Sequence, residues 1–100
     1  MTLSKTRMSF YRRLYVAHLI ATGSASVPAI TEATGMPRRT AQDTLTALAE
    51  LDIRCEFEHR AGAPHNIGAY VIHDWGPIDR AWVATHAERL RTALGYPPRP

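Results

Sequence analysis

The spacing of apolar residues predicts a helix at the start of the chain, over residues 4–22, and Gly23 follows where a helical C-terminus is expected. One face of this helix carries the side chains that recur at helical spacing: Met8, Tyr11, Leu14, Tyr15, His18 and Leu19. No residue from Leu14 to Ala21 is charged. This half of the helix therefore needs cover on nearly every side, from the C-terminal helix or from a second subunit.

Two further helices are predicted next, joined by a tight turn. Residues 24–27 form a brief extended link, Pro28 opens a helix that Gly35 ends, and a third helix is predicted over residues 37–51. The side of the third helix that is expected to pack consists of Ala41, Thr44, Leu45, Leu48 and Ala49. The side that is expected to be free consists of Arg39, Gln42, Asp43 and Thr46. Two helices joined in this way form a helix-turn-helix.

After residue 52 the period changes from helical to alternating, which predicts a β-hairpin. Ile53, Cys55 and Phe57 alternate with charged residues, as in a strand with one buried face. Residues 67–73 form a second strand, and the turn-rich loop 60–66 joins the two. A last helix is predicted over residues 78–94, with one apolar face made of Val83, Ala87, Leu90 and Leu94.

The composition is that of one globular domain. Of the 100 residues, 45% are hydrophobic and 21% are charged, a balance that favours a packed core. We predict a single domain over residues 1–95 and a frayed tail over residues 96–100. The longest uncharged stretch, residues 14–31, contains glycine, proline and several hydroxyl groups, so no membrane span is predicted. The absence of a secretory signal pattern and the single cysteine, Cys55, favour a cytoplasmic protein.

The formal charge of +3 is unevenly distributed. Residues 1–13 carry four positive charges and no negative one, whereas residues 43–58 carry five acidic side chains and a single arginine. This asymmetry favours a polyanionic partner.

The segment from Val27 to Thr40, VPAITEATGMPRRT, resembles the helix-turn-helix core of bacterial winged-helix transcriptional regulators. In that family a small residue lies midway along the first helix of the pair, a glycine opens the turn, and a Pro-Arg-Arg-Thr-like start leads the recognition helix. The resemblance covers residues 4–73 and extends to the small stand-alone winged-helix proteins of bacteria. It implies an α+β, mainly α fold with a three-helix core, a β-hairpin wing and, here, an added C-terminal helix. It also implies sequence-selective binding of double-stranded DNA and regulation of transcription.

The helix over residues 37–51 is then the expected probe of the major groove, which admits one α-helix. Its candidate DNA-binding residues are Arg38, Arg39, Thr40, Gln42, Asp43 and Thr46. The glutamine can pair with an adenine edge and either arginine with a guanine edge, while the threonines can contact phosphate oxygens or a thymine methyl group. Asp43 can accept a hydrogen bond from cytosine N4, or it can pair with Arg39 four residues earlier, which the frequency of such pairs favours.

Four residues outside this helix are further candidates for DNA contact. Lys5 and Arg7 lie near a helix N-terminus, where the macrodipole disfavours cations, so they contact phosphates or simply form a solvated face. In the winged-helix resemblance the hairpin loop lies along the flanking backbone or minor groove, where Arg60 and His65 are candidates. The alternative for both is an ordinary surface loop.

No catalytic, metal or cofactor site is predicted from the sequence, and we expect a binding protein, not an enzyme. The residues that suggest a metal, Cys55, His59, His65 and His73, lack the close pairs that zinc sites use. Cys55 shares the phase of the apolar strand residues, which is typical of a small buried side chain. No Gly-rich phosphate loop or nucleophile motif is present in the sequence.

The protein is expected to assemble as a dimer. Regulators of this kind usually present two recognition helices to two half-sites, so we predict a homodimer through helices 4–22 and 78–94. Its seam is expected to use Val16 and Ile20 of the first helix and the stripe Val83, Ala87, Leu90 and Leu94 of the last; alternatively, Leu90 belongs to the core of one chain. An alternative function is a winged helix that acts as a protein-interaction module without binding DNA, with the apolar surface of the first helix as its interface.

Overall fold

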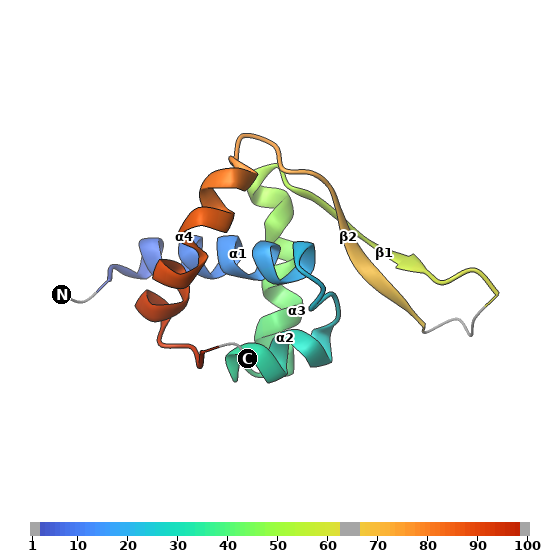
Figure 1. The fold of residues 1–100 in the computed structure, drawn as a ribbon, viewed down its shortest axis with the longest axis horizontal. Helices are drawn as coiled ribbons and strands as arrows, with labels where there is room; N and C mark the ends of the chain where they lie inside the picture. The colour runs from blue at the N-terminus through green and yellow to red at the C-terminus, as the bar shows by residue number, and fades with distance from the viewer. Residues whose placement is uncertain (1–2, 63–66, 99–100) are drawn as a thin grey trace.

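The computed structural model describes residues 3–62 and 67–98 and has the predicted architecture. In chain order the elements are α1 (Lys5–Ala21), α2 (Val27–Thr34), α3 (Arg38–Ala47), the 3-10 helix η1 (Leu48–Leu51), β1 (Arg54–His59), β2 (Gly68–Asp74) and α4 (Arg80–Leu94). The two strands pair antiparallel into a hairpin, called the wing below, that extends away from the helices (Figure 1). The fold is mainly helical: a three-helix core, a wing and a C-terminal helix.

Helix α1 is the centre of the core. It begins after Ser4, whose hydroxyl accepts a hydrogen bond from the Arg7 amide at 3.1 Å. Its uncharged second half packs against α4, α3 and β2 of the same chain, so Val16 and Leu19 are fully buried. Of the two covers that the sequence left open, the C-terminal helix is the one that packs on α1. No helix in the described ranges is both long enough and apolar enough to cross a membrane.

The prediction that Val16, Ile20, Val83 and Leu90 lie at a subunit seam is wrong, because the chain buries these side chains itself. Val16, Ile20 and Leu90 are at most 5% exposed and belong to the core of the single chain. The outer surfaces of α1 and α4 carry a different apolar pair, defined here as the outer patch: Phe10 and Trp82, which are 37% and 39% exposed and line one shallow groove.

The helix-turn-helix is closed by local hydrogen bonds. The Ser26 hydroxyl accepts from the Ala29 amide at 3.2 Å and caps α2. Gly35 ends α2 in the left-handed conformation, with φ +79°, which a residue with a side chain rarely adopts. The next amide, from the buried Met36, donates to the Thr34 hydroxyl at 3.1 Å, which fixes the turn into α3.

Helix α3 is shorter than predicted. It was expected to continue to Leu51, but α-helical geometry ends at Ala47 and the chain tightens into η1. Asp52 then takes φ +60°, the left-handed conformation that a short polar residue tolerates, and directs the chain into β1.

The strand β1 has its predicted buried face only at the root of the wing, where the hairpin leaves the helices. Ile53 is 2% exposed and Cys55 is half-buried, but Phe57 is 37% exposed because the wing has by then passed the edge of the helices. The Phe57 ring packs edge-on against Tyr70 of β2, with ring centroids 5.1 Å apart. The link over residues 24–27 is not a strand. It makes one backbone hydrogen bond to the wing, from the Tyr70 amide to the Ala25 carbonyl at 2.9 Å.

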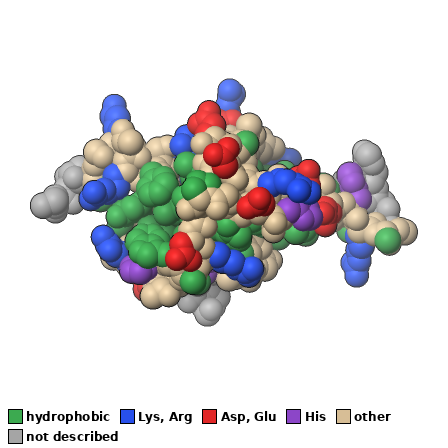
Figure 2. Space-filling view, turned by 90° about the horizontal axis from the view of Figure 1, so that it is seen from above, with side chains coloured by type: hydrophobic (Ala, Val, Ile, Leu, Met, Phe, Trp, Pro, Cys, Tyr) green, Lys and Arg blue, Asp and Glu red, His purple; other side chains and the backbone are tan. Residues whose placement is uncertain are grey.

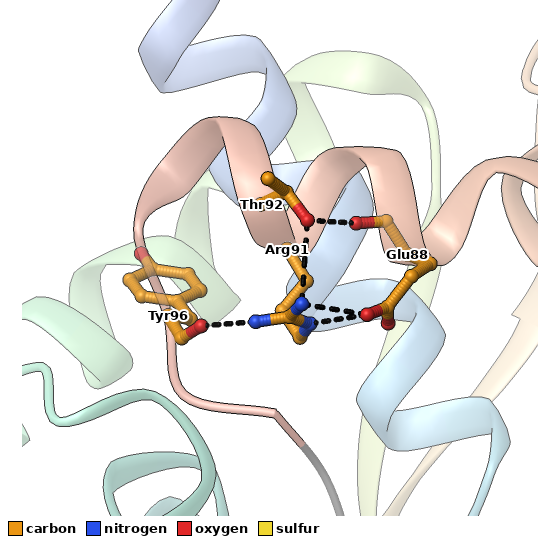
Figure 3. Close-up of polar contacts among 4 residues, drawn as sticks. All are labelled: Glu88, Arg91, Thr92 and Tyr96. Atoms are coloured by element: carbon orange, nitrogen blue, oxygen red, sulfur yellow. Dashed lines mark hydrogen bonds and ion pairs between the residues drawn. The ribbon is translucent and has the colours of Figure 1, made fainter.

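The end of α4 is tied to the residue that follows it. The Arg91 guanidinium donates to the Glu88 carboxylate at 2.6 Å and to the Tyr96 carbonyl at 2.6 Å (Figure 3). The Tyr96 ring lies 5.7 Å from that of the buried Tyr15 in α1, centroid to centroid. Tyr96, which the sequence places in the tail, is therefore packed against the folded body.

Candidate nucleic-acid interface

Helix α3 has one buried and one exposed side. Its buried residues, Ala41, Thr44 and Leu45, face α1 and α2. The exposed side, called the outer face of α3, consists of Arg38, Arg39, Gln42, Asp43 and Thr46. Four of them were predicted as the free side, and helical spacing places Arg38 beside them. Ala49, expected on the packed side, is exposed because it lies in η1, beyond the end of α3.

Asp43 pairs with Arg39, as the second of the two sequence interpretations proposed. The Arg39 Nε atom lies 3.9 Å from the Asp43 carboxylate, and the two side chains are 91% and 74% exposed. An exposed pair at this spacing contributes about 0.3–0.5 kcal/mol. Asp43 therefore holds the Arg39 guanidinium only weakly, and a more strongly charged anion can replace Asp43 as its partner.

The two threonines of α3 differ in what their hydroxyl groups can still do. The Thr46 hydroxyl donates to the Gln42 carbonyl at 3.1 Å, so its hydrogen is already used and its methyl group is the part suited to a base. Thr40 makes no such bond in the described part of the chain, and its side chain lines a groove beside α1. The two positions therefore suit different contacts, a thymine methyl group for Thr46 and a phosphate oxygen for Thr40.

The start of α3 is open toward solvent. Pro37 occupies the N-cap position, no side chain caps the first turn, and that turn contains no acidic residue. The free amide groups of a helix N-terminus carry partial positive charge, and here Arg38 and Arg39 add two full charges. A phosphate group is the kind of ligand that such an end attracts.

A groove between α1 and α3 brings in residues that the sequence analysis missed as candidates. It encloses about 330 Å³ and is lined by Ser9, Arg12, Arg13, Thr40, Asp43, Thr44 and Ala47. Arg13 is paired across the groove with Glu50 at 3.5 Å. Arg12 is partly buried, and within residues 3–62 and 67–98 its guanidinium has no ion pair. The charge run of residues 1–13 indicated these arginines, but only the packing of α1 on α3 shows which of them lie beside the outer face.

Lys5 and Arg7 lie on different sides of α1 relative to the groove, although their positions in the sequence did not distinguish them. Both are exposed. Lys5 lies on the side of α1 that carries Ser9 and Arg12, four and seven residues farther on, and so it extends the groove. Arg7 lies two residues from Lys5, about 160° away around the helix, and points away from the groove.

The wing carries one predicted contact residue within the described ranges. Arg60 follows β1 and is exposed, and its amide donates to the Ile67 carbonyl at 2.9 Å, across the start of the loop. Its guanidinium has no ion pair in the part of the chain that the structure describes. His65 lies outside the described residues.

Cys55 has the environment of a packed side chain. Its half-burial at the wing root, and then the neighbouring Glu56 carboxylate, raise the pKa of the Cys55 thiol. The thiolate, which is the nucleophilic form of cysteine, is therefore disfavoured at neutral pH.

Comparisons with known proteins agree with this geometry. A family model described as a winged helix-turn-helix matches residues 5–94. The crystal structure of a DUF2131 family protein from Shewanella amazonensis SB2B superposes with a TM-score of 0.87 at 40% sequence identity, over 95% of this chain and 91% of that one. No curated protein matches the sequence. The winged helix-turn-helix is a non-enzymatic fold family of the DNA-binding type. With nine-tenths of its length matched, the chain belongs to the winged helix-turn-helix family.

Proposed function

We propose that this protein binds double-stranded DNA sequence-selectively and regulates transcription, with α3 in the major groove. The observation that supports this most directly is the outer face of α3. It presents two arginines and a glutamine on an exposed helix whose opposite side is fixed in the core. Gln42 suits an adenine edge, and Arg38 and Arg39 suit guanine edges.

Basic and hydroxyl side chains on both sides of α3 are placed to contact DNA phosphates in this binding mode. Arg12, Lys5 and the Thr40 hydroxyl border the groove on one side, and the open N-terminus of α3 lies next to them. Arg60 extends the contact to the wing. Arginine and lysine at such positions hold the backbone without reading sequence, whereas the outer face of α3 reads bases.

The test is a fluorescence-anisotropy titration, first against a random-sequence duplex pool at low salt and then against duplexes selected from that pool. We expect affinity for the pool to fall with salt at a log–log slope of about −0.9 for each phosphate neutralised. Gln42→Ala should cost about 1–3 kcal/mol at one base position, whereas Arg12→Ala should weaken all sequences alike and reduce the slope by about 1.

Arg89→Ala is the matched control for Arg12→Ala, because Arg89 is an exposed arginine on α4, which packs on α1. It should leave affinity and slope unchanged. If the unaltered protein does not bind the pool at low salt, the proposal fails. If Gln42→Ala weakens every duplex equally, Gln42 is not a base-reading residue.

We also propose that two copies bind one site as a homodimer, through the outer patch on α1 and α4. The supporting observation is that Phe10 and Trp82 remain exposed beside each other after the chain has buried its core. Sedimentation of the unaltered protein should then give twice the chain mass of 11.1 kDa, and Trp82→Arg should give a folded monomer. A mass near 11.1 kDa at tens of micromolar would remove the dimer. A DNA partner implies that the protein acts in the bacterial cytoplasm.

A further inference from the structure

One face of the wing gathers three potential metal ligands from both strands. Glu56 and Glu58 lie two residues apart on β1 and so share a face, and His73 of β2 lies on that face too. The His73 Nε2 atom is 2.6 Å from the Glu58 carboxylate and 3.3 Å from that of Glu56. One ligand atom from each residue lies within 4.8 Å of the other two.

The centre of this cluster already holds hydrogen-bond donors against the two carboxylates. An imidazole Nε2 atom can lie 2.6 Å from a carboxylate oxygen only if a proton is between them, because both atoms otherwise present lone pairs. The Arg54 guanidinium also approaches the Glu56 carboxylate, at 3.4 Å. Figure 2 shows histidine, acidic and basic side chains crowded together on the wing. The two carboxylates bring a charge of −2, which these partners offset only in part when the imidazole is neutral.

The spacing and donor set suit a divalent transition-metal ion. Zinc binds imidazole nitrogen and carboxylate oxygen at about 2.0–2.2 Å, which places neighbouring ligand atoms about 3.4 Å apart in a tetrahedral site. The contact between His73 and Glu56 already has this length. A shift of less than about 1 Å at the Glu58 carboxylate would bring it to the same distance from His73 Nε2. All three side chains are accessible to solvent, with exposures of 29–54%. Three protein ligands leave a coordination position open to water or an anion.

We propose that Glu56, Glu58 and His73 form a binding site for one divalent transition-metal ion, such as zinc. The ion replaces the proton at His73 Nε2, displaces the Arg54 contact, and cancels the charge of the two carboxylates. The strand register holds the two glutamates in place, because Glu56 pairs with Val71 and Glu58 with Ala69, while His73 lies at a register shift near the root of the wing. The sequence did not reveal the site because two of the three ligands are glutamates, which do not belong to the cysteine and histidine spacings typical of zinc motifs.

The test is zinc titration by isothermal calorimetry on the full chain without a histidine tag, in a non-chelating buffer. We expect one equivalent to bind. His73→Gln and Glu58→Gln should each weaken binding by about tenfold or more, since each removes a ligand. Cobalt(II), used as a spectroscopic substitute, should give a visible absorption band that both variants lose. Zinc should raise the melting temperature of the unaltered protein but not that of the variants.

His59→Gln is the matched control. His59 belongs to the same hairpin but lies on its other face, with its ring 5.2 Å from that of Phe57. It should leave zinc affinity unchanged. The proposal is overturned if no saturable equivalent binds, or if His59→Gln weakens binding and His73→Gln does not. None of these measurements uses DNA, so the result is independent of the function proposed above.

Discussion

Leu90→Ala tests whether α4 belongs to the core of one chain or to an interface between two chains. Leu90 is fully buried, and α4 packs along α1. The change removes three carbon atoms at about 0.8 kcal/mol each, or about 2.4 kcal/mol of transfer free energy. The cavity left behind adds to this, because the surroundings relax only in part, and the total becomes about 3–5 kcal/mol.

The assay is urea unfolding followed by circular dichroism, with sedimentation of the same samples. A loss of 3 kcal/mol or more in the free energy of unfolding corresponds to a fall in melting temperature of at least about 12 °C for a domain of this size. Leu94→Ala is the control one turn farther along α4, where the side chain is only half-buried, and its loss should be clearly smaller. The reasoning is refuted if Leu90→Ala changes the free energy of unfolding by less than about 1 kcal/mol.

Two further predictions concern the turns and the end of α4. Gly76→Ala should lower the free energy of unfolding by roughly 1–3 kcal/mol, because Gly76 has φ +58° and an added Cβ would collide with the Asp52 backbone, 2.9 Å from its carbonyl carbon. Gly95→Ala, at φ +74° but in open space, should cost less in the same urea titration. The hydrogen bond from Arg91, and then its charge, lower the pKa of Glu88, so this pair stabilises the fold above the ordinary glutamate pKa and ceases to do so as pH falls through the lowered value. Glu88→Gln should therefore be less stable than the unaltered protein at pH 7 and equal to it at low pH, and a constant difference at both pH values would contradict this account.

The elements could be predicted from the sequence because their signals are local. The apolar period of residues 4–22, Gly35 after α2 and the alternation after residue 52 each specify a conformation within a few residues. The outer face of α3 follows from the same period, since a helix with one apolar side leaves its polar side exposed. The Arg39 and Asp43 pair was predictable for this reason too.

What the sequence could not supply depends on contacts between distant segments. Leu90 appears available for a partner until α1 is seen to cover it. Arg12 becomes a candidate only because α1 packs beside α3, and Phe57 is exposed because the wing extends past the helices. Each outcome is set by the relative placement of whole elements, which no local period encodes.

The hydrogen bond between the Tyr70 amide and the Ala25 carbonyl ties the wing to the link between α1 and α2. The link lies at the base of a lever whose far end carries Arg60. We expect a displacement of Ala25 to change the angle at which the wing leaves the body, with an effect that grows with distance along the strands. Substitutions in residues 24–26 can therefore alter the span between α3 and Arg60 while leaving both surfaces chemically unchanged.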